Sequence, residues 1–538
     1  MELAPKAPPE QFNFAAHLLA LNQARGEKVA YIDDLGTLTY AELEHRIRSF
    51  ASSLLRLGLR REERILVAML DTVDLPVVFL GALYAGVVPV LVNTLLTADD
   101  YAYMIGHSRA QLVVTSGPLL DKLRAAVTTS GTSLRLLVSQ PAARDAAADG
   151  APGVPGAPGA PGAHGAPGDL DLDALLAEPP AAAPADTHVD DIAFWLYSSG
   201  STGRPKGTVH THGNLHWTAE LYAKPILGIR ESDVVFSAAK LFFAYGLGNA
   251  LTFPLSVGAT TVLMAERATC DAIFARLTRH KPTLFCGVPT LFLAMLASPA
   301  LPARADVALR VCTSAGEALP QQVGERFTAH FGAEILDGIG STEMLHIFLS
   351  NRPGEVVYGT TGVPVPGYDV ALRDETGALV PDGEIGDLYV KGPSTALLYW
   401  RNRDKTRATF LGDWMKTGDK YQRLPTGHYV YAGRSDDMLK VSGQYVAPVE
   451  VEIVLQEHEC VLEAAVIGKV DPSGLMRTCA FVVLREGHAP GDHLVLALQA
   501  FVKGRLAPHK YPREIAFVTE LPKTATGKIQ RFRLREGG

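Results

Sequence analysis

The sequence predicts an α/β protein with a parallel sheet, then a β-rich segment and a small α+β region toward the C-terminus. In the first part, short apolar runs alternate with helical patterns, as in parallel sheets covered by helices. After Gly362, short strand-like runs are separated by turn signals at 374–377 and 381–383. Beyond a boundary near 433–437, helical and strand patterns are mixed.

The first well-marked helix is expected to begin after Thr39. Thr39 and Glu42 have the spacing of a capping box. Apolar residues then recur on one helical face, and Gly58 marks the end of the helix. That face comprises Leu43, Ile47, Phe50, Leu54 and Leu57. Residues 64–69 and 111–115 read as apolar strands, so helices and strands alternate.

Residues 75–92 carry no charge and resemble a membrane-spanning segment in composition. They also contain prolines and glycines that would interrupt a single long helix, namely Pro76, Gly81, Gly86 and Pro89. We therefore expect a buried helix, a turn and a core strand at 90–92 rather than a membrane span.

The end of the chain predicts a separate small domain. Its pattern gives a helix, two strands and a second helix, at 449–456, 464–467, 480–484 and 494–506. We place the N-terminal domain at 1–434, with its β-rich subdomain at about 355–434, and the C-terminal domain at 435–538.

Residues 150–168 place glycine at every third position, with prolines and alanines between. The run matches a collagen repeat but is far too short for a triple helix of three chains. We expect a poorly ordered surface insertion that carries no chemistry and that a protease would cut first.

The composition is typical of a cytoplasmic enzyme with small-molecule substrates. Of 538 residues, 47% are hydrophobic and 20% are charged. The net charge of −7 argues against nucleic acid or an anionic membrane as the main partner. Five scattered cysteines without a C-x-x-C pair predict buried, reduced thiols, and no signal peptide is visible. We expect a monomer or homodimer.

A loop rich in glycine and hydroxyl residues, at 197–207, is the most informative short segment. Its backbone N–H groups can converge on phosphate oxygens, and its hydroxyls and lysine add donors. A Walker A spacing is absent, and a flexible turn is the alternative for the loop taken alone. The expected phosphate contacts are Ser198, Ser199, Gly200, Ser201, Thr202, Gly203 and Lys206.

Further short motifs follow this loop in order, at 314–317, 337–343, 417–419, 433–437 and 522–528. With them the chain resembles the adenylate-forming superfamily of acyl-CoA synthetases, peptide-synthetase adenylation domains and luciferases. Apart from the insertion, the resemblance covers essentially the whole chain. Residues 240–249 and 342–351 are most similar to benzoate–CoA ligases. The resemblance implies a large N-terminal domain of two α/β sheets plus a β-rich subdomain, and a small mobile C-terminal domain.

The implied chemistry uses ATP, Mg²⁺ and coenzyme A. A carboxylate is a poor electrophile because its leaving group would be oxide. Transfer to the α-phosphate of ATP gives an acyl adenylate, and the thiol of coenzyme A then displaces AMP. No protein nucleophile is required, which agrees with the lack of a Ser-His-Asp or Cys-His signature.

The resemblance assigns nucleotide contacts residue by residue. Thr342 is expected to bond the α-phosphate and Glu343 to ligate Mg²⁺, although Glu343 alone would read as a solvated acid in a helix turn. Asp419 is expected to accept from the ribose hydroxyls and Arg434 to donate to ribose or phosphate. The adenine-binding walls are expected at Gly316, Glu317, Asp337, Gly338 and Ile339. Ile339 stands where the wider superfamily has an aromatic residue, so adenine would lie against an aliphatic side chain.

Three C-terminal residues receive mechanistic roles from the resemblance. Lys528 is expected to bridge the carboxylate and the α-phosphate during adenylation, where negative charge accumulates. Asp436 is expected to be a hinge, and Gly443 to lie near the coenzyme A tunnel. Rotation about the hinge would let one site serve two reactions.

A flat aryl pocket is the last expectation. Residues 242–246 mix aromatic rings with small side chains, and His346 and Ile347 follow on an expected helix start. Such walls suit a small planar ring, whereas ordinary core is the alternative. The pocket candidates are Ala244, Tyr245, Gly340, His346 and Ile347. These segments contain no charged partner for a second carboxylate or an amino group, which disfavours amino acids and dicarboxylates.

Several activities remain open at this point. A stand-alone enzyme that loads an aryl acid onto a carrier protein would share every motif, as would a ligase for a substituted benzoate. An oxygen-using luciferase-like enzyme and a non-catalytic nucleotide sensor are further alternatives. Thioester formation with free coenzyme A, light output, and benzoate-dependent pyrophosphate release separate them.

Overall fold

The computed structural model describes residues 5–140, 168–198, 204–435, 438–441, 444–470, 476–506, 510–523 and 529–536. The glycine–proline insertion therefore lies outside the described residues, apart from Gly168. The chain divides into two compact units. Unit 1 comprises Met1–Tyr358, Pro364–Asp369 and Lys391–Met415, and unit 2 comprises Gly359–Val363, Val370–Val390 and Lys416–Gly538.

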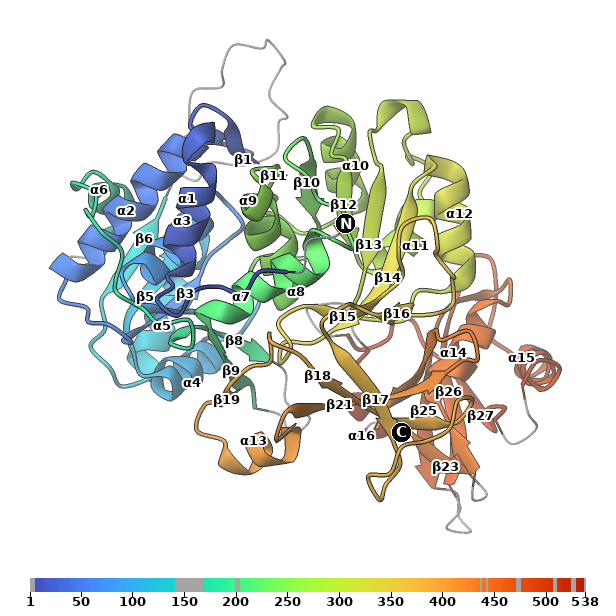
Figure 1. The fold of residues 1–538 in the computed structure, drawn as a ribbon. Coiled ribbons are helices and arrows are strands. Elements are labelled where there is room, and N and C mark those ends of the chain that lie inside the picture. The colour runs from blue at the N-terminus through green and yellow to red at the C-terminus, as the bar shows by residue number, and fades with distance from the viewer. Residues whose placement is uncertain are drawn as a thin grey trace. The chain divides into compact units, whose positions relative to one another are not determined.

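Unit 1 contains two α/β sheets, as expected (Figure 1). One sheet has the spatial order β19 (Leu398–Tyr399), β9 (Lys206–Thr211), β8 (Ile192–Ser198), β4 (Val88–Leu91), β3 (Arg64–Ala68), β5 (Ala110–Ser116), β6 (Leu136–Ser139) and β7 (Leu170–Asp171). The other includes, in order, β15 (Ile347–Ser350), β14 (Glu334–Gly340), β13 (Val311–Ser314), β12 (Leu284–Gly287), β10 (Val234–Ser237), β11 (Thr260–Val262), β1 (Val29–Asp33) and β2 (Gly36–Thr39).

Helices cover both sheets of unit 1. Around the first sheet lie α1 (Phe14–Asn22), α2 (Tyr40–Arg56), α3 (Asp74–Tyr84), α4 (Ala98–Ser108), α5 (Leu120–Thr129) and α6 (Leu172–Leu176). The chain continues with α7 (His212–Thr218), α8 (Ala244–Leu247) and α9 (Phe253–Val257), joined by π-helical turns at Ala219–Ala223 and Gly248–Thr252. Beside the second sheet lie α10 (Cys270–Arg279), α11 (Pro289–Ala297) and α12 (Gln321–Phe331), whereas α13 (Arg403–Thr409) follows β19. Short 3₁₀ turns occur at Gln23–Arg25, Gly117–Leu119 and Arg304–Asp306.

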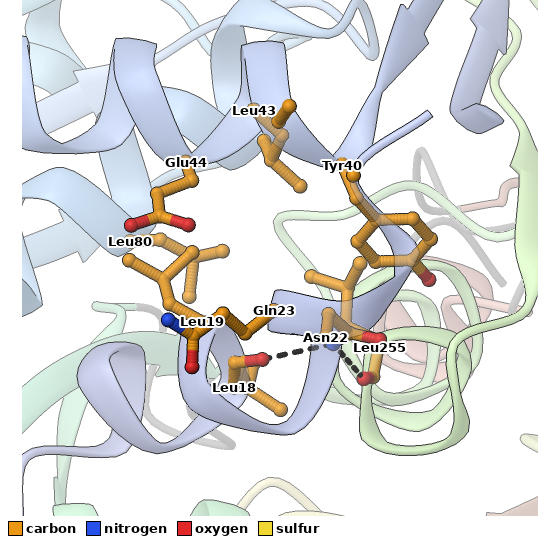
Figure 2. Close-up of a pocket in the computed structure, with 11 residues that line it drawn as sticks. Leu18, Leu19, Asn22, Gln23, Tyr40, Leu43, Glu44, Leu80 and Leu255 are labelled. Atoms are coloured by element: carbon orange, nitrogen blue, oxygen red, sulfur yellow. Dashed lines mark hydrogen bonds between the residues drawn. The ribbon is translucent and has the colours of Figure 1, made fainter. Parts of the chain in front are cut away.

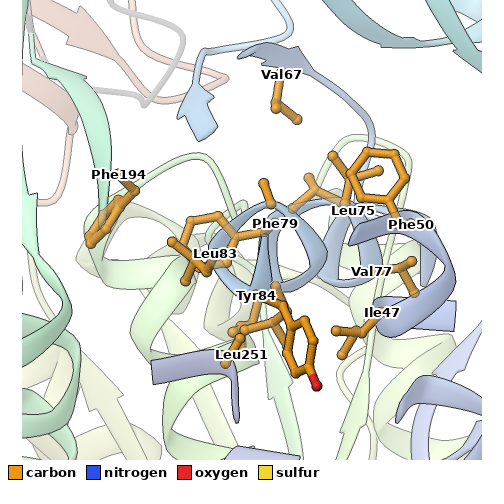
Figure 3. Packing of buried hydrophobic residues seen from close by; sticks show 14 of the residues in the cluster. Ile47, Phe50, Val67, Leu75, Val77, Phe79, Leu83, Tyr84, Phe194 and Leu251 are labelled. Atoms are coloured by element: carbon orange, nitrogen blue, oxygen red, sulfur yellow. The ribbon is translucent and has the colours of Figure 1, made fainter. Parts of the chain in front are cut away.

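The expected N-terminal elements are confirmed. The capping box of α2 is formed by Thr39 and Glu42, and Gly58 has a positive φ of 88° after the helix ends. Strand β3 sends Val67 into the cluster that contains Phe50 and Phe79 (Figure 3), and the alternate residue Leu66 into a second cluster on the other face. Burial of both faces explains the nearly continuous apolar run of this strand.

The uncharged segment 75–92 folds as expected into buried α3, a turn and β4. Every residue of α3 is buried, so its apolar composition reflects the protein core. Within the described parts of the chain, we find no helix with the length and apolar character that crossing a bilayer requires.

A small pocket of about 70 Å³ lies among α1, α2, α3 and α9 (Figure 2). Asn22 at the end of α1 donates from Nδ2 to the carbonyls of Leu18 and Leu255, both at 2.8 Å, and so ties α1 to α9. The pocket is much smaller than a typical ligand site. It contains none of the expected site residues.

The β-rich and α+β segments are also as expected. Unit 2's first sheet contains most of β17 (Asp369–Arg373), β18 (Ile385–Lys391) and β21 (Trp414–Arg423), and all of β22 (Tyr429–Arg434). The short strand β20 (Phe410–Leu411) belongs to unit 1, where it pairs with Trp414 and Met415. The end of the chain holds β23 (Leu439–Val441), β24 (Gln444–Val446), α14 (Pro448–Gln456), β25 (Val461–Val470), β26 (Met476–Leu484), α15 (Asp492–Lys503), β27 (Glu514–Phe517) and α16 (Arg531–Glu536).

Two expectations about local structure are wrong. His346 and Ile347 do not begin a helix, because Ile347 opens strand β15 and pairs with Gly340 of β14. Cys270 is only partly buried, whereas the other four cysteines are buried. All five lie in described parts of the chain and are free thiols.

Candidate active site

Strands β8 and β9 hold the glycine-rich loop at its two ends. The strands are antiparallel, and Ser198 pairs directly with Lys206 across them. The expected phosphate ligands Ser199, Gly200, Ser201, Thr202 and Gly203 lie outside the described residues. The hairpin therefore fixes where the loop leaves and re-enters the sheet, and it presents Lys206 at that point.

The Lys206 ammonium lies beside Glu343. Its Nζ is 3.7 Å from Oε1 of Glu343 and donates to the Tyr399 hydroxyl at 3.3 Å. The Tyr399 hydroxyl in turn donates to the same Oε1 at 2.6 Å. Unit 1 thus brings together the lysine expected at the phosphates and the carboxylate expected at Mg²⁺, with a tyrosine between them that the sequence analysis did not identify.

A rigid turn, not a helix, carries Thr342 and Glu343. Ser341 Oγ accepts from the Met344 amide at 3.1 Å, and Leu345 has a positive φ of 64°. The Glu343 carbonyl accepts from the Ala396 amide at 2.8 Å. Because a non-glycine residue at positive φ needs support from its surroundings, these contacts define one conformation of the turn.

His210 on β9 supports the same turn by a hydrogen bond to its backbone. Its Nε2 is 2.7 Å from the Thr342 carbonyl, which can only accept, so the neutral ring donates from Nε2. The imidazole stacks on Phe194 with ring centroids 5.2 Å apart. Burial lowers the pKa of His210 to about 4, although the hydrogen bond to the Thr342 carbonyl favours the charged form. The ring is therefore an uncharged donor at neutral pH.

The Glu343 carboxylate is a suitable ligand for Mg²⁺. The described part of the chain contains no group of three or more histidine, cysteine, aspartate or glutamate residues that could hold a metal. Mg²⁺ typically needs only one or two carboxylates, because nucleotide phosphates and water supply the remaining oxygens. Among the described contacts of Glu343, the side-chain partners engage Oε1, so Oε2 is the oxygen that would face a metal.

The expected adenine walls meet at the ends of adjacent strands. Ser314 of β13 pairs with Asp337 of β14, so the two expected wall segments, 314–317 and 337–339, both start at this pair. Gly316 has a positive φ of 96°, which turns the chain away after β13. Burial raises the pKa of Asp337 well above its usual range.

Close packing explains Gly338, because a Cβ on this residue would lie 2.9 Å from the Leu349 carbonyl oxygen. Ile339 pairs with Leu349 in β15. These contacts fix the backbone that the resemblance places against adenine.

The aryl-pocket candidates cluster around His346. Tyr245 of α8 stacks on the His346 ring, with centroids 5.6 Å apart and planes at 26°. Phe253 meets the same ring edge-on at 4.5 Å, and Tyr222 lies 5.2 Å away. Burial lowers the pKa of His346 to about 3, so this ring is neutral. The result is an aromatic, uncharged wall, and Ala244 precedes Tyr245 at the start of α8.

Glycines allow this close approach. A Cβ on Gly340 would lie 2.5 Å from the His346 carbonyl oxygen, and one on Gly248 would lie 2.4 Å from the His346 ring. Ile347 is buried beside Gly340. The segment from Gly340 to Ile347 therefore contains three of the expected aryl-pocket residues as well as Thr342 and Glu343.

Unit 2 contains the two expected ribose contacts. Asp419 of β21 pairs with Arg434 of β22, and Nη1 of Arg434 is 3.1 Å from Oδ1 of Asp419. Gly418 has a positive φ of 79°, and its carbonyl accepts from the Ser435 amide at 2.9 Å. Lys528, Asp436 and Gly443 lie outside the described residues.

Sequence reasoning missed His210 and Tyr399. The histidine lies one residue after β9's apolar Val209, and Tyr399 stands in the run Leu398–Tyr399 followed by Trp400. Both patterns read as core, and both residues are in fact buried. The only signal that could have singled out either residue is its contact with the turn, which no local pattern carries.

Comparison with known proteins finds matches over most of the chain. The family described as AMP-binding enzyme matches residues 20–400, and the AMP-binding enzyme C-terminal domain matches residues 450–528. A benzoate–CoA ligase of Thauera aromatica is 55% identical, over 98% of this chain and 96% of its own length. A 4-hydroxybenzoate–CoA/benzoate–CoA ligase of Rhodopseudomonas palustris is 47% identical, over 98% and 95% respectively.

Solved structures agree with these matches. The crystal structure of a benzoate CoA ligase from Burkholderia xenovorans LB400 has a TM-score of 0.88 and 65% identity, covering 97% of this chain and 100% of that one. An anthranilate CoA ligase in complex with anthranoyl-AMP has a TM-score of 0.90 and 37% identity, with 98% of each chain covered.

Proposed function

The chain belongs to the AMP-binding enzyme family, and from this premise we propose that it is an AMP-forming benzoate–CoA ligase. A benzoate oxygen attacks the α-phosphorus of ATP, and pyrophosphate leaves with its electron pair. The thiol of coenzyme A, after losing its proton, then attacks the carbonyl carbon of benzoyl-AMP, and AMP leaves. ATP and coenzyme A are co-substrates, and Mg²⁺ neutralises phosphate charge when bound.

One observation carries the proposal beyond the family. The turn between β14 and β15 contains Thr342 and Glu343, and it is flanked by Gly340 and His346 of the aryl pocket. A ring held beside His346 would therefore have its carboxylate close to residues suited to the α-phosphate and metal. Such proximity converts a bimolecular attack into an effectively intramolecular one.

The uncharged aromatic wall supports benzoate as the acid. Tyr245, Phe253 and His346 pack against one another, and the imidazole is neutral because burial lowers its pKa to about 3. Flat rings favour a planar substrate, and a neutral wall offers no ion pair to a second carboxylate or an ammonium group.

The remaining roles are part of the proposal. Lys206 and the loop before it would bind the β- and γ-phosphates, and Asp419 with Arg434 would bind the ribose. Lys528 would stabilise charge in adenylation, and rotation near Asp436 would exchange it for the face that carries Gly443. The boundary between the two proposed domains lies at 434/435. Limited proteolysis should therefore cut there and leave two stable fragments.

The decisive experiment measures both half-reactions. Benzoate-dependent exchange of labelled pyrophosphate into ATP reports adenylation, and benzoyl-CoA formation with free coenzyme A reports the full reaction. We expect kcat/KM for benzoate to exceed that for hexanoate and cyclohexanecarboxylate, which lack a planar ring. Adenylation without transfer to free coenzyme A, or no benzoate-dependent exchange, would refute the proposed function.

The proposal also includes a cellular location and an oligomeric state. The five free thiols support a cytoplasmic location. A monomer or homodimer is expected, and sedimentation of the purified chain at several concentrations distinguishes them.

A further inference from the structure

Tyr399 occupies a position between the two charged groups of the candidate site. Its hydroxyl donates to Glu343 Oε1 at 2.6 Å and accepts from Lys206 Nζ at 3.3 Å. The ammonium also lies over the Tyr399 ring, 4.3 Å from the centroid. One side chain thus contacts both the carboxylate expected at the metal and the lysine expected at the phosphates.

The fold holds this tyrosine firmly. Tyr399 is only 3% exposed and pairs with Thr208 across β19 and β9. Its amide donates to Thr406 Oγ1 at 3.1 Å, and its ring packs on Phe410 with centroids 5.4 Å apart. Because backbone and ring are both fixed, the hydroxyl can orient a carboxylate that would otherwise rotate.

The two carboxylate oxygens of Glu343 have different surroundings. Tyr399 and Lys206 both approach Oε1, and within the described part of the chain no side chain donates a hydrogen bond to Oε2. A carboxylate hydrogen-bonded on one oxygen presents the other in a defined direction, as supporting residues do for metal ligands in general.

Lys206 and Glu343 form a long ion pair. Their distance of 3.7 Å is long for a charge-assisted hydrogen bond, and both side chains are about 15% exposed. The aromatic ring offers the ammonium a favourable surface without a strong directional bond. Mg²⁺ and a phosphate would each supply an opposite charge that lets the pair separate.

We infer that Tyr399 is a positioning residue that aims Glu343 at Mg²⁺ and holds Lys206 ready until nucleotide arrives. The inference rests on the proposed function, since it concerns the same ATP site. With MgATP bound, Glu343 would contact the metal in place of the ammonium and Lys206 would contact a phosphate in place of the carboxylate, so each charge would keep a partner of opposite sign.

The test removes only the hydroxyl. Tyr399→Phe keeps the ring for packing and for Lys206 but loses the bond to Glu343. Tyr101→Phe is the matched control, because Tyr101 is fully buried and its hydroxyl donates to the Asn93 carbonyl at 2.7 Å. Calorimetry measures ATP binding in the absence of benzoate over a series of Mg²⁺ concentrations. This measurement requires no turnover.

We expect Tyr399→Phe to raise the Mg²⁺ concentration for half-maximal ATP binding by about tenfold or more, and Tyr101→Phe to leave it at the wild-type value. In a Glu343→Gln background the Tyr399→Phe effect should disappear, because the two residues act through one contact. A lowered melting temperature with unchanged Mg²⁺ dependence would overturn the inference, as would an equal effect in both backgrounds. Wild-type protein that binds no MgATP would instead overturn the proposed function.

Discussion

Replacing His210 should remove a defined part of the protein's acid sensitivity. The imidazole is fully buried, stacks on Phe194, and donates from Nε2 to the Thr342 carbonyl at 2.7 Å. Burial lowers the pKa of His210 from 6.5 to about 4. The folded protein therefore binds this proton more weakly than the unfolded chain does. Lowering the pH then favours unfolding, and stability is lost as the pH falls from about 6.5 toward 4.

The size of the effect follows from these two values. Each unit of pH between them costs about 1.4 kcal/mol, so His210 should cost the wild-type protein about 2 kcal/mol between pH 7 and pH 5. His210→Gln removes the titrating group, while its amide can still donate to the Thr342 carbonyl. Other buried groups, such as His346 and Asp71, titrate in both proteins and cancel in the comparison.

Urea unfolding followed by tryptophan fluorescence measures this difference. All four tryptophans lie in unit 1, together with His210, so the signal reports on that unit; they are Trp195, Trp217, Trp400 and Trp414. Between pH 7 and pH 5, the free energy of unfolding should fall by about 2 kcal/mol less in His210→Gln than in the wild type. An equal fall in both proteins would show that His210 is not a buried neutral donor.

Three further outcomes test the site itself. Lys528→Ala should abolish benzoyl-AMP formation but largely spare thioester formation from preformed benzoyl-AMP in single-turnover assays; equal loss of both would exclude its role. Asp436→Pro should impair thioester formation more than adenylation, and unchanged thioester synthesis would reject the hinge. Gly248→Ala should lower kcat/KM for benzoate by about a hundredfold. The new methyl group would lie only 2.4 Å from the His346 ring, so the ring would have to move. Gly106→Ala, whose methyl group would have no neighbour within 4 Å, is its control, and equal activities would contradict the pocket assignment.

Local signals predicted the elements that local interactions determine. The capping box at Thr39 and the interruption of the apolar run at Gly86 each depend on residues close in sequence, and each has the expected geometry. Gly86, with φ of 72°, turns the chain between α3 and β4. The short motifs also contain Lys206 and Glu343, but the role of Glu343 was predicted from the family resemblance, since the residue alone would read as a solvated acid.

The structure of residues 346 and 347 required information that the local pattern lacks. Glu-Met-Leu-His-Ile is compatible with a helix by propensity. In the protein, Ile347 pairs with Gly340 and Leu349 with Ile339, so the chain reverses after β14 and forms the antiparallel strand β15 beside it. Pairing with a neighbouring strand overrides a weak helical preference, and Gly340 permits the tight approach that this reversal needs.

The same reasoning explains why Tyr399 escaped notice although it contacts two predicted residues. It lies 193 residues from Lys206 and 56 from Glu343. A tyrosine in an apolar strand reads as core, and burial is in fact what makes it useful, because a fixed ring holds its hydroxyl in one place. Residues that react carry their chemistry in their type and can be found by motif. Residues that only orient them have ordinary types and acquire a role through position. The supporting part of an active site therefore becomes visible only when the fold brings distant strands together.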